Sequence, residues 1–148
     1  MFNIKNNPYQ LLLLTAIVLL FALLFSPIAK LDFQDVKLFS FPIKTMFWII
    51  PLFHIFLWVL YLLTKKFLYS IASTWIHTII TILVTILILM FLFVGISPSQ
   101  GITENHETIG SLMQILSLIF ILAQLIYLAN VLLGLLMAKK IWINDKST

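Results

Sequence analysis

Four apolar segments dominate this sequence, and each is long enough to cross a membrane as a helix. They cover residues 11–29, 46–63, 70–96 and 112–138. A helix needs about 20 mostly apolar residues to span the roughly 30 Å hydrocarbon core of a bilayer. The sequence therefore predicts an all-α fold: an integral membrane four-helix bundle that forms a single transmembrane domain over residues 1–148.

The composition agrees with this assignment. Hydrophobic residues make up 62% of the chain and charged residues 9%, and the mean hydropathy is +1.13. A soluble domain, in which about a quarter of the residues are charged, could not bury this much apolar surface. Cysteine is absent, which excludes a disulfide framework and the thiol chemistry of a membrane disulfide oxidoreductase.

The basic residues indicate membrane anchoring. All nine are lysines, and they stand at the ends of apolar segments rather than in a patch with interleaved aromatics. Such a distribution is typical of a protein oriented by its loops in a membrane and not of a nucleic-acid-binding surface. We therefore expect the lipid bilayer as a partner and no nucleic acid.

Lys65 and Lys66 separate the second segment from the third. A single helix over residues 46–96 would be about 75 Å long at about 1.5 Å per residue, far more than a bilayer core. It would also place both lysines near its middle, where each costs about 3 kcal/mol to insert. Two antiparallel spans with a turn at residues 64–69 avoid both costs.

The first segment has an alternative interpretation. Lys5 followed by the apolar residues 11–25 also resembles the charged and apolar regions of a signal peptide. Ser26, Pro27, Ile28 and Ala29 lack the usual small-x-small cleavage pattern. We favour a retained first helix, and cleavage would leave three spans.

The lysines also predict the direction of the spans. One side collects Lys5, Lys65, Lys66, Lys139, Lys140 and Lys146, and the other collects Lys30, Lys37 and Lys44. Residues 97–111, on the second side, contain two glutamates and no lysine. Because the lysine-rich side faces the cytoplasm, both termini are expected inside. We expect a multi-pass protein of the bacterial inner membrane.

No Asp, Glu, Lys or Arg lies well inside a span, which argues against a pump or secondary transporter. Two histidines remain. His54 shares a helical face with Trp58, Tyr61 and Lys65, so it could offer its imidazole to a haem iron or a quinone oxygen beside aromatic rings. Alternatively, it is hydrogen-bonded to a neighbouring helix, where Pro51 leaves a backbone acceptor free. We favour the second interpretation.

The second histidine, His77, lies near the start of the third span, where threonines follow the spacing i, i+4, i+7 and i+11: Thr74, Thr78, Thr81 and Thr85. Hydroxyls on a membrane helix usually bond to carbonyls of their own helix or link two helices. We therefore expect packing here. Counted from the turn at residues 64–69, His54 rises higher than His77 by about one helical turn, so the two are poorly matched as ligands of one haem.

The last span carries polar and small residues on two sides. Gln114, Ser117 and Gln124 lie on one, and Ala123, Tyr127, Asn130, Gly134 and Ala138 on the other. The second set suits close helix contact. In the preceding loop, Glu104, His106 and Glu107 could bind a metal weakly, but we expect them to be solvated and predict no metal site.

The order of several residues along this chain resembles the order found in a known protein family. Asp32 and Asp35 precede Phe53-His54-Ile55, and Tyr61, Lys65 and Lys66 then lead to Trp75-Ile76-His77-Thr78. Residues 31–140 thereby resemble the C-terminal transmembrane region of haem-copper (cytochrome c/quinol) oxidase subunit I, in a small and degenerate form. The resemblance implies that His54 stands at the position of the low-spin haem ligand.

The same resemblance has departures. Leu52 occupies the position of the high-spin haem ligand, and the family's copper ligands belong to other helices. Oxygen reduction by this chain alone is therefore not expected, and a partner for His54 would have to come from elsewhere.

Two functions stay open. The first is a non-catalytic structural or accessory membrane protein, associated with other membrane subunits, a respiratory oxidase among them, or with further copies of itself. The second is a haem- or quinone-binding electron-transfer subunit that uses His54. A channel is poorly supported, because no span shows a continuous polar face. We favour the first, with no catalytic residues and no cofactor, and with haem as the candidate cofactor of the second.

Overall fold

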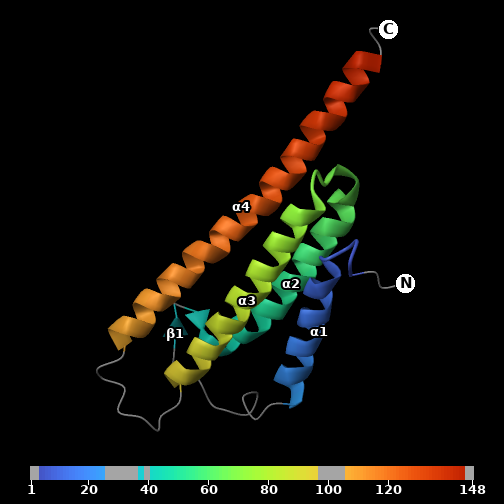
Figure 1. The fold of residues 1–148 in the computed structure, drawn as a ribbon. Helices are drawn as coiled ribbons and strands as arrows, with labels where there is room; N and C mark the ends of the chain where they lie inside the picture. The colour runs from blue at the N-terminus through green and yellow to red at the C-terminus, as the bar shows by residue number, and fades with distance from the viewer. Residues whose placement is uncertain (1–3, 26–36, 39–40, 97–105, 146–148) are drawn as a thin grey trace. The chain divides into compact units, whose positions relative to one another are not determined.

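A computed structural model describes residues 4–25, 37–38, 41–96 and 106–145. The described residues form four α-helices: α1 (Gln10–Phe25), α2 (Ile43–Thr64), α3 (Ile71–Ile96) and α4 (His106–Asp145) (Figure 1). Helices account for nearly all of the described chain, which confirms the predicted all-α class.

Three helical stretches of the described chain are long and apolar enough to cross a membrane: Phe47–Phe67, Ile71–Leu92 and Gly110–Ala138. Helix α1 is equally apolar but has 16 described residues, which corresponds to about 24 Å. The rest of the predicted first span, residues 26–29, lies outside the described residues. The molecule is thus a small helical membrane protein with three long candidate spans.

The observed ends of the helices agree with the ends of the predicted spans to different degrees. Helix α3 begins one residue later than predicted and ends at the predicted residue, whereas α4 extends well beyond residues 112–138 at both ends. Hydropathy indicates which residues can contact lipid, but a helix continues beyond them wherever its backbone hydrogen bonds continue. The apolar segment therefore predicts only the middle of α4.

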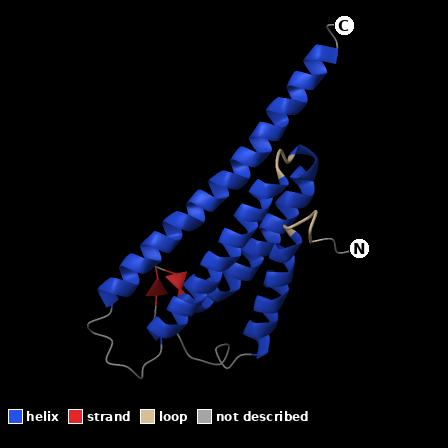
Figure 2. Cartoon of the chain, in the orientation of Figure 1, coloured by secondary structure: helices blue, strands red, loops and turns tan. Residues whose placement is uncertain are grey.

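A short antiparallel ladder precedes α2. Strand β1 (Lys37–Leu38) pairs with β2 (Phe41–Pro42), so that Lys37 lies opposite Pro42 and Leu38 opposite Phe41. The ladder is drawn in red in Figure 2. The sequence predicted only a connection between spans in this region and not the ladder.

The predicted break between the second and third spans is confirmed. Helix α2 ends at Thr64, a 3-10 helix covers Lys65–Phe67, and α3 begins at Ile71. Thr64 Oγ1 donates to the Leu60 carbonyl oxygen over 2.8 Å, as is common for hydroxyls on apolar helices.

The contacts divide the chain into two compact units, Met1–Lys65 and Lys66–Thr148. The single domain over residues 1–148 therefore stays a prediction. In the first unit, α1 and α2 pack against each other. The Tyr9 ring, just before α1, stacks on the Tyr61 ring in the last turns of α2, with centroids 5.3 Å apart. The start of α1 thus lies beside the end of α2, and the two helices are antiparallel.

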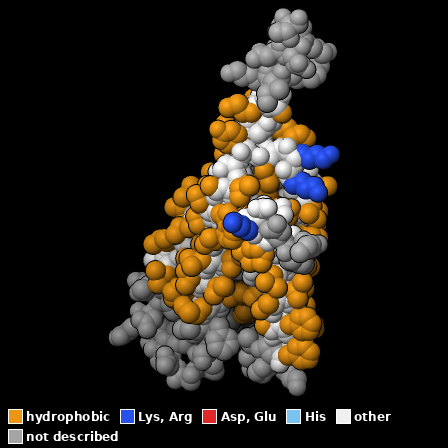
Figure 3. Space-filling view, turned by 45° about the vertical axis from the view of Figure 1, so that its right-hand side comes forward, with side chains coloured by type: hydrophobic (Ala, Val, Ile, Leu, Met, Phe, Trp, Pro, Cys, Tyr) orange, Lys and Arg blue, Asp and Glu red, His pale blue; other side chains and the backbone are white. Residues whose placement is uncertain are grey.

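In the second unit, α3 and α4 pack along each other. Polar residues dominate the buried face of α3, which contains Thr74, His77, Thr78, Thr81, Val84 and Thr85. Its opposite face exposes large apolar side chains such as Ile79, Leu83 and Ile86. Figure 3 shows apolar side chains over most of the visible described surface. This inside-out distribution is expected of a helix pair whose solvent is lipid.

Candidate functional site: the polar seam between α3 and α4

The buried polar residues of the second unit form two clusters, which we call the polar seam. One cluster contains Ser70, Thr74 and Asn130, and the other His77, Thr81 and Gln124. Residues 70, 74, 77 and 81 share one face of a helix because their spacing alternates between four and three. Asn130 pairs with residues 70 and 74, whereas Gln124, earlier in α4, pairs with residues 77 and 81, which come later in α3. The two helices are therefore antiparallel.

The first cluster is built around the Asn130 side chain. Its Oδ1 accepts the Ser70 backbone N–H over 2.8 Å. Its Nδ2 lies 3.0 Å from the Ser70 carbonyl oxygen and 3.1 Å from Thr74 Oγ1, and it donates to both. Ser70 immediately precedes α3, where backbone N–H groups have no partner within the helix. Asn130 therefore caps α3 from a different helix.

The backbone of α4 approaches the same turn closely. The Tyr69 N–H donates to the Asn130 carbonyl oxygen over 3.2 Å. One turn further along α4, Gly134 faces the Phe67 carbonyl group so closely that a Cβ atom at this position would overlap it. Glycine is thus required here for the approach of the two backbones.

The second cluster is a triangle of side chains. His77 Nε2 lies 3.2 Å from Gln124 Oε1 and 3.3 Å from Thr81 Oγ1. Gln124 Nε2 closes the triangle at 3.5 Å from Thr81 Oγ1 and also lies 3.4 Å from the Phe120 carbonyl oxygen. The Tyr127 ring packs at 5.6 Å from the His77 ring. His77 has no exposed surface.

These contacts fix the proton on His77. The Phe120 carbonyl can only accept a hydrogen bond, so the amide nitrogen of Gln124 must be the atom that faces it. The amide oxygen then faces His77, and because an amide oxygen also only accepts, His77 Nε2 carries the proton. The nitrogen that usually binds a metal or haem iron is therefore engaged in helix packing.

Two further threonines lie on the same buried face. Thr85 Oγ1 donates to the Thr81 carbonyl oxygen over 2.8 Å. Thr78 Oγ1 is buried without a hydrogen-bond partner. The expected packing role is confirmed for Thr74, Thr81 and Thr85, whereas Thr78 carries an unsatisfied hydroxyl.

The candidate ligand His54 lies in the first unit, on the buried face of α2. Its Nδ1 lies 3.0 Å from the carbonyl oxygen of Ile50, one turn earlier in the same helix. Because that carbonyl can only accept, Nδ1 is the donor, and Nε2 of a neutral imidazole then carries the lone pair. This contact lies within α2, and the predicted bond of His54 to a neighbouring helix stays a prediction.

The surroundings of His54 decide whether haem fits. The Nε2 lone pair is the right donor for an axial ligand. However, the side chain is fully enclosed, with an exposed fraction of 0%. A porphyrin could reach it only if the side chains that enclose it moved away. The donor chemistry thus fits haem and the space around it does not.

The helical spacing in the last span predicted the contact face of α4 but misplaced one residue of the seam. Ala123, Asn130 and Gly134 were predicted on the contact face, and Ala123 and Asn130 are indeed buried. Gln124 was predicted on the other side with Gln114 and Ser117, which are exposed. Gln124 is only about one turn from Tyr127 and Phe120, and its long side chain reaches the seam from the edge of that face.

Of the residues considered for a weak metal site, His106 and Glu107 begin α4 and not a loop, and Glu104 lies outside the described residues. None of the three side chains is described, so this expectation is not tested. Comparison with known protein families, curated proteins and solved structures finds no match for this chain. The resemblance to haem-copper oxidase subunit I stays a prediction.

Proposed function

We propose that this chain is a non-catalytic structural membrane protein whose intramembrane polar residues hold its helices together. The pairing of His77, Thr81 and Thr74 on α3 with Gln124 and Asn130 on α4 carries this proposal. Lipid offers no hydrogen bonds, so polar side chains at this depth must find partners within the protein. Here they are engaged with each other, which is the arrangement of an interface and not of a site awaiting a ligand.

Replacement of Asn130 by leucine tests the proposal. Asn130→Leu keeps the side-chain size but leaves the Ser70 N–H and Thr74 hydroxyl without these partners. We expect a loss of about 1–3 kcal/mol in the free energy of unfolding, measured by SDS titration of the protein in mixed micelles. The matched control is Gln114→Leu on the exposed face of the same helix, which should change it by less than about 0.5 kcal/mol. Equal stability of the two variants would contradict the proposal.

We also propose that α1 belongs to a fourth span and that both termini are cytoplasmic. The apolar character of α1 and the collection of lysines on one side support this topology. A reporter fused after Thr148 should be accessible only from the cytoplasm. Accessibility from the opposite side would refute the lysine argument.

The second candidate is an electron-transfer subunit that binds haem or quinone at His54 and associates with a respiratory oxidase. The tautomer of His54 favours it, because Nδ1 donates to the Ile50 carbonyl and the lone pair is then on Nε2, the atom that binds a haem iron. Absorption spectra of the purified protein, oxidised and reduced, from cells that make haem test it. A Soret band that disappears in His54→Ala would place this candidate above the structural role.

A further inference from the structure

The end of the first unit at which α1 begins and α2 ends has a defined arrangement. The Tyr9 and Tyr61 rings stack there at an interplanar angle of 9°, and both side chains are buried. Tyr9 Oη donates to Asn7 Oδ1 over 3.0 Å, and the Gln10 and Leu11 N–H groups donate to the carbonyl oxygens of Asn7 and Pro8. The short segment before α1 is therefore fixed against the last turns of α2.

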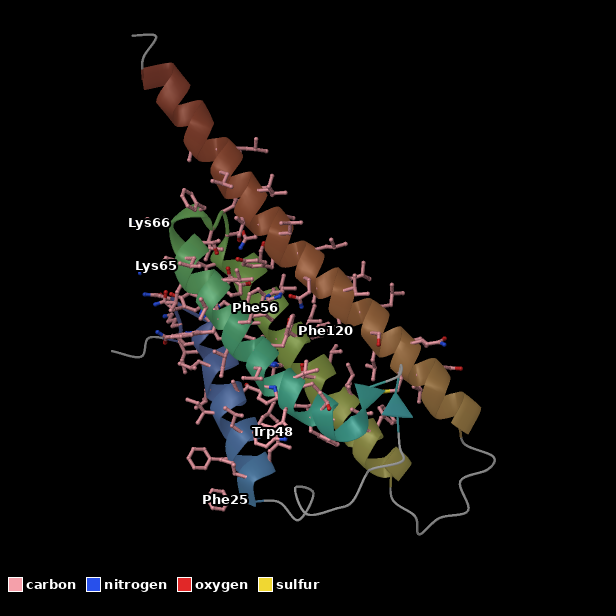
Figure 4. All side chains as sticks on the ribbon, turned by 180° about the vertical axis from the view of Figure 1, so that it is seen from behind. Phe25, Trp48, Phe56, Lys65, Lys66 and Phe120 are labelled. Carbon is pink, nitrogen blue, oxygen red and sulfur yellow. The ribbon has the colours of Figure 1, made fainter. Side chains whose placement is uncertain are left out.

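This arrangement brings lysines together. Lys5 precedes Tyr9 by four residues, and Lys65 follows Tyr61 by one helical turn, so both lie at the end that the tyrosine pair marks. Both side chains are exposed. Figure 4 labels Lys65 and Lys66 at the end of α2. Among the side chains that the structure describes, none is acidic, so these ammonium groups meet no carboxylate there.

Exposed apolar residues stand close to both lysines along the chain, Ile4 next to Lys5 and Leu63 two residues before Lys65. Leu63 is 71% exposed and Ile4 is 36% exposed. Leu63 belongs to the candidate span Phe47–Phe67, so its exposed surface is expected to face lipid acyl chains. The lysines thus lie where the apolar surface of a span ends, at the level of the lipid headgroups.

We propose that Lys5 and Lys65 bind the phosphate group of an anionic phospholipid, whose acyl chains lie along the adjoining apolar surface of α2. A lysine near an anionic membrane surface contributes about fivefold to binding. A lipid provides the negative charge and the apolar chains in one molecule, which matches lysines beside Leu63. An acidic protein or a nucleic acid would match only the lysines.

Lipid retention by the purified full-length chain tests this proposal. The protein, in a neutral detergent, is mixed with equal amounts of phosphatidylglycerol and phosphatidylcholine that have the same acyl chains. Native mass spectrometry then counts each bound lipid. We expect phosphatidylglycerol to be retained preferentially. The double variant K5Q/K65Q should lower that preference roughly 25-fold at low salt, and high salt should weaken it in the unmodified protein.

The control removes two other lysines. K30Q/K37Q changes the net charge by the same amount but alters lysines predicted on the other side of the membrane, and it should keep the preference. K5R/K65R, which keeps the charge, should keep it too. Equal retention of the two lipids by the unmodified protein would overturn the proposal. An equal loss in both glutamine variants would also overturn it, because the preference would then follow net charge and not this site.

Discussion

Thr78 and Thr81 lie on the same buried face of α3 but have opposite hydrogen-bonding situations. Thr81 Oγ1 is within reach of both His77 and Gln124, whereas Thr78 Oγ1 is buried with no partner. Desolvating a hydroxyl costs free energy that only a hydrogen bond offsets. The two residues should therefore respond in opposite directions to the same substitution.

Valine replaces a threonine hydroxyl with a methyl group of nearly the same size. We expect Thr78→Val to raise the free energy of unfolding by about 1 kcal/mol, because it removes an unsatisfied polar atom. Thr81→Val should lower it by a similar amount. Each variant serves as the control for the other in the same SDS titration. A destabilised Thr78→Val protein would show that its hydroxyl has a partner after all.

The roles of the two histidines depend on contacts that spacing does not reveal. The sequence identified both as polar residues at depth and favoured packing for His77, which its contacts with Gln124 and Thr81 confirm. Helical spacing gives the face on which a ring lies, but the position of its proton depends on which acceptor is opposite. That acceptor is Gln124 for His77 and the Ile50 carbonyl for His54, 47 and 4 residues away respectively.

At the scale of the elements, Gly134 decides how closely α4 approaches the turn before α3. A methyl group at Gly134 would overlap the Phe67 carbonyl, a backbone group that cannot rotate away. We expect Gly134→Ala to lower the free energy of unfolding by about 1–3 kcal/mol through overpacking. It should also loosen the bonds of Asn130 to Ser70, which hydrogen exchange at the Ser70 amide would report.

Gly110, in the same helix, is the matched control. A Cβ atom there meets nothing within 4 Å. Gly110→Ala should therefore stabilise the helix by about 0.5–1 kcal/mol, because alanine favours helical backbone more than glycine does. If both alanine variants behaved alike, the close approach at Gly134 would be refuted.

The elements were predictable to different degrees. The end of α2 and the start of α3 were predicted to within one residue, because charge and hydropathy change together at Lys65 and Lys66. Helix α2 begins at Ile43, three residues before the predicted span. The ends of α4 were not predictable from its apolar run, and neither was the ladder at Lys37–Pro42, whose strands have two residues each. The capping of α3 by Asn130 was also missed, since it joins residues 60 positions apart.

At the scale of the whole molecule, apolar side chains are exposed and polar side chains are buried, which is the opposite of the arrangement in a soluble protein. Large apolar side chains are exposed along all four helices, while His54, Thr74, His77, Thr81 and Asn130 are buried. Burial of apolar surface gives little drive for association between helices already in lipid. Close packing and interhelical hydrogen bonds must supply it, and in the second unit the polar seam does so.

The most direct test of this account is a double-mutant cycle across the seam. The free energy of unfolding is measured for the unmodified protein, for His77→Ala, for Gln124→Ala and for the double variant. The account predicts that the two substitutions are coupled by about 0.6 to 1.7 kcal/mol, the range of interhelical hydrogen bonds in membranes. Strictly additive effects would contradict it, because His77 and Gln124 would then not hold α3 to α4.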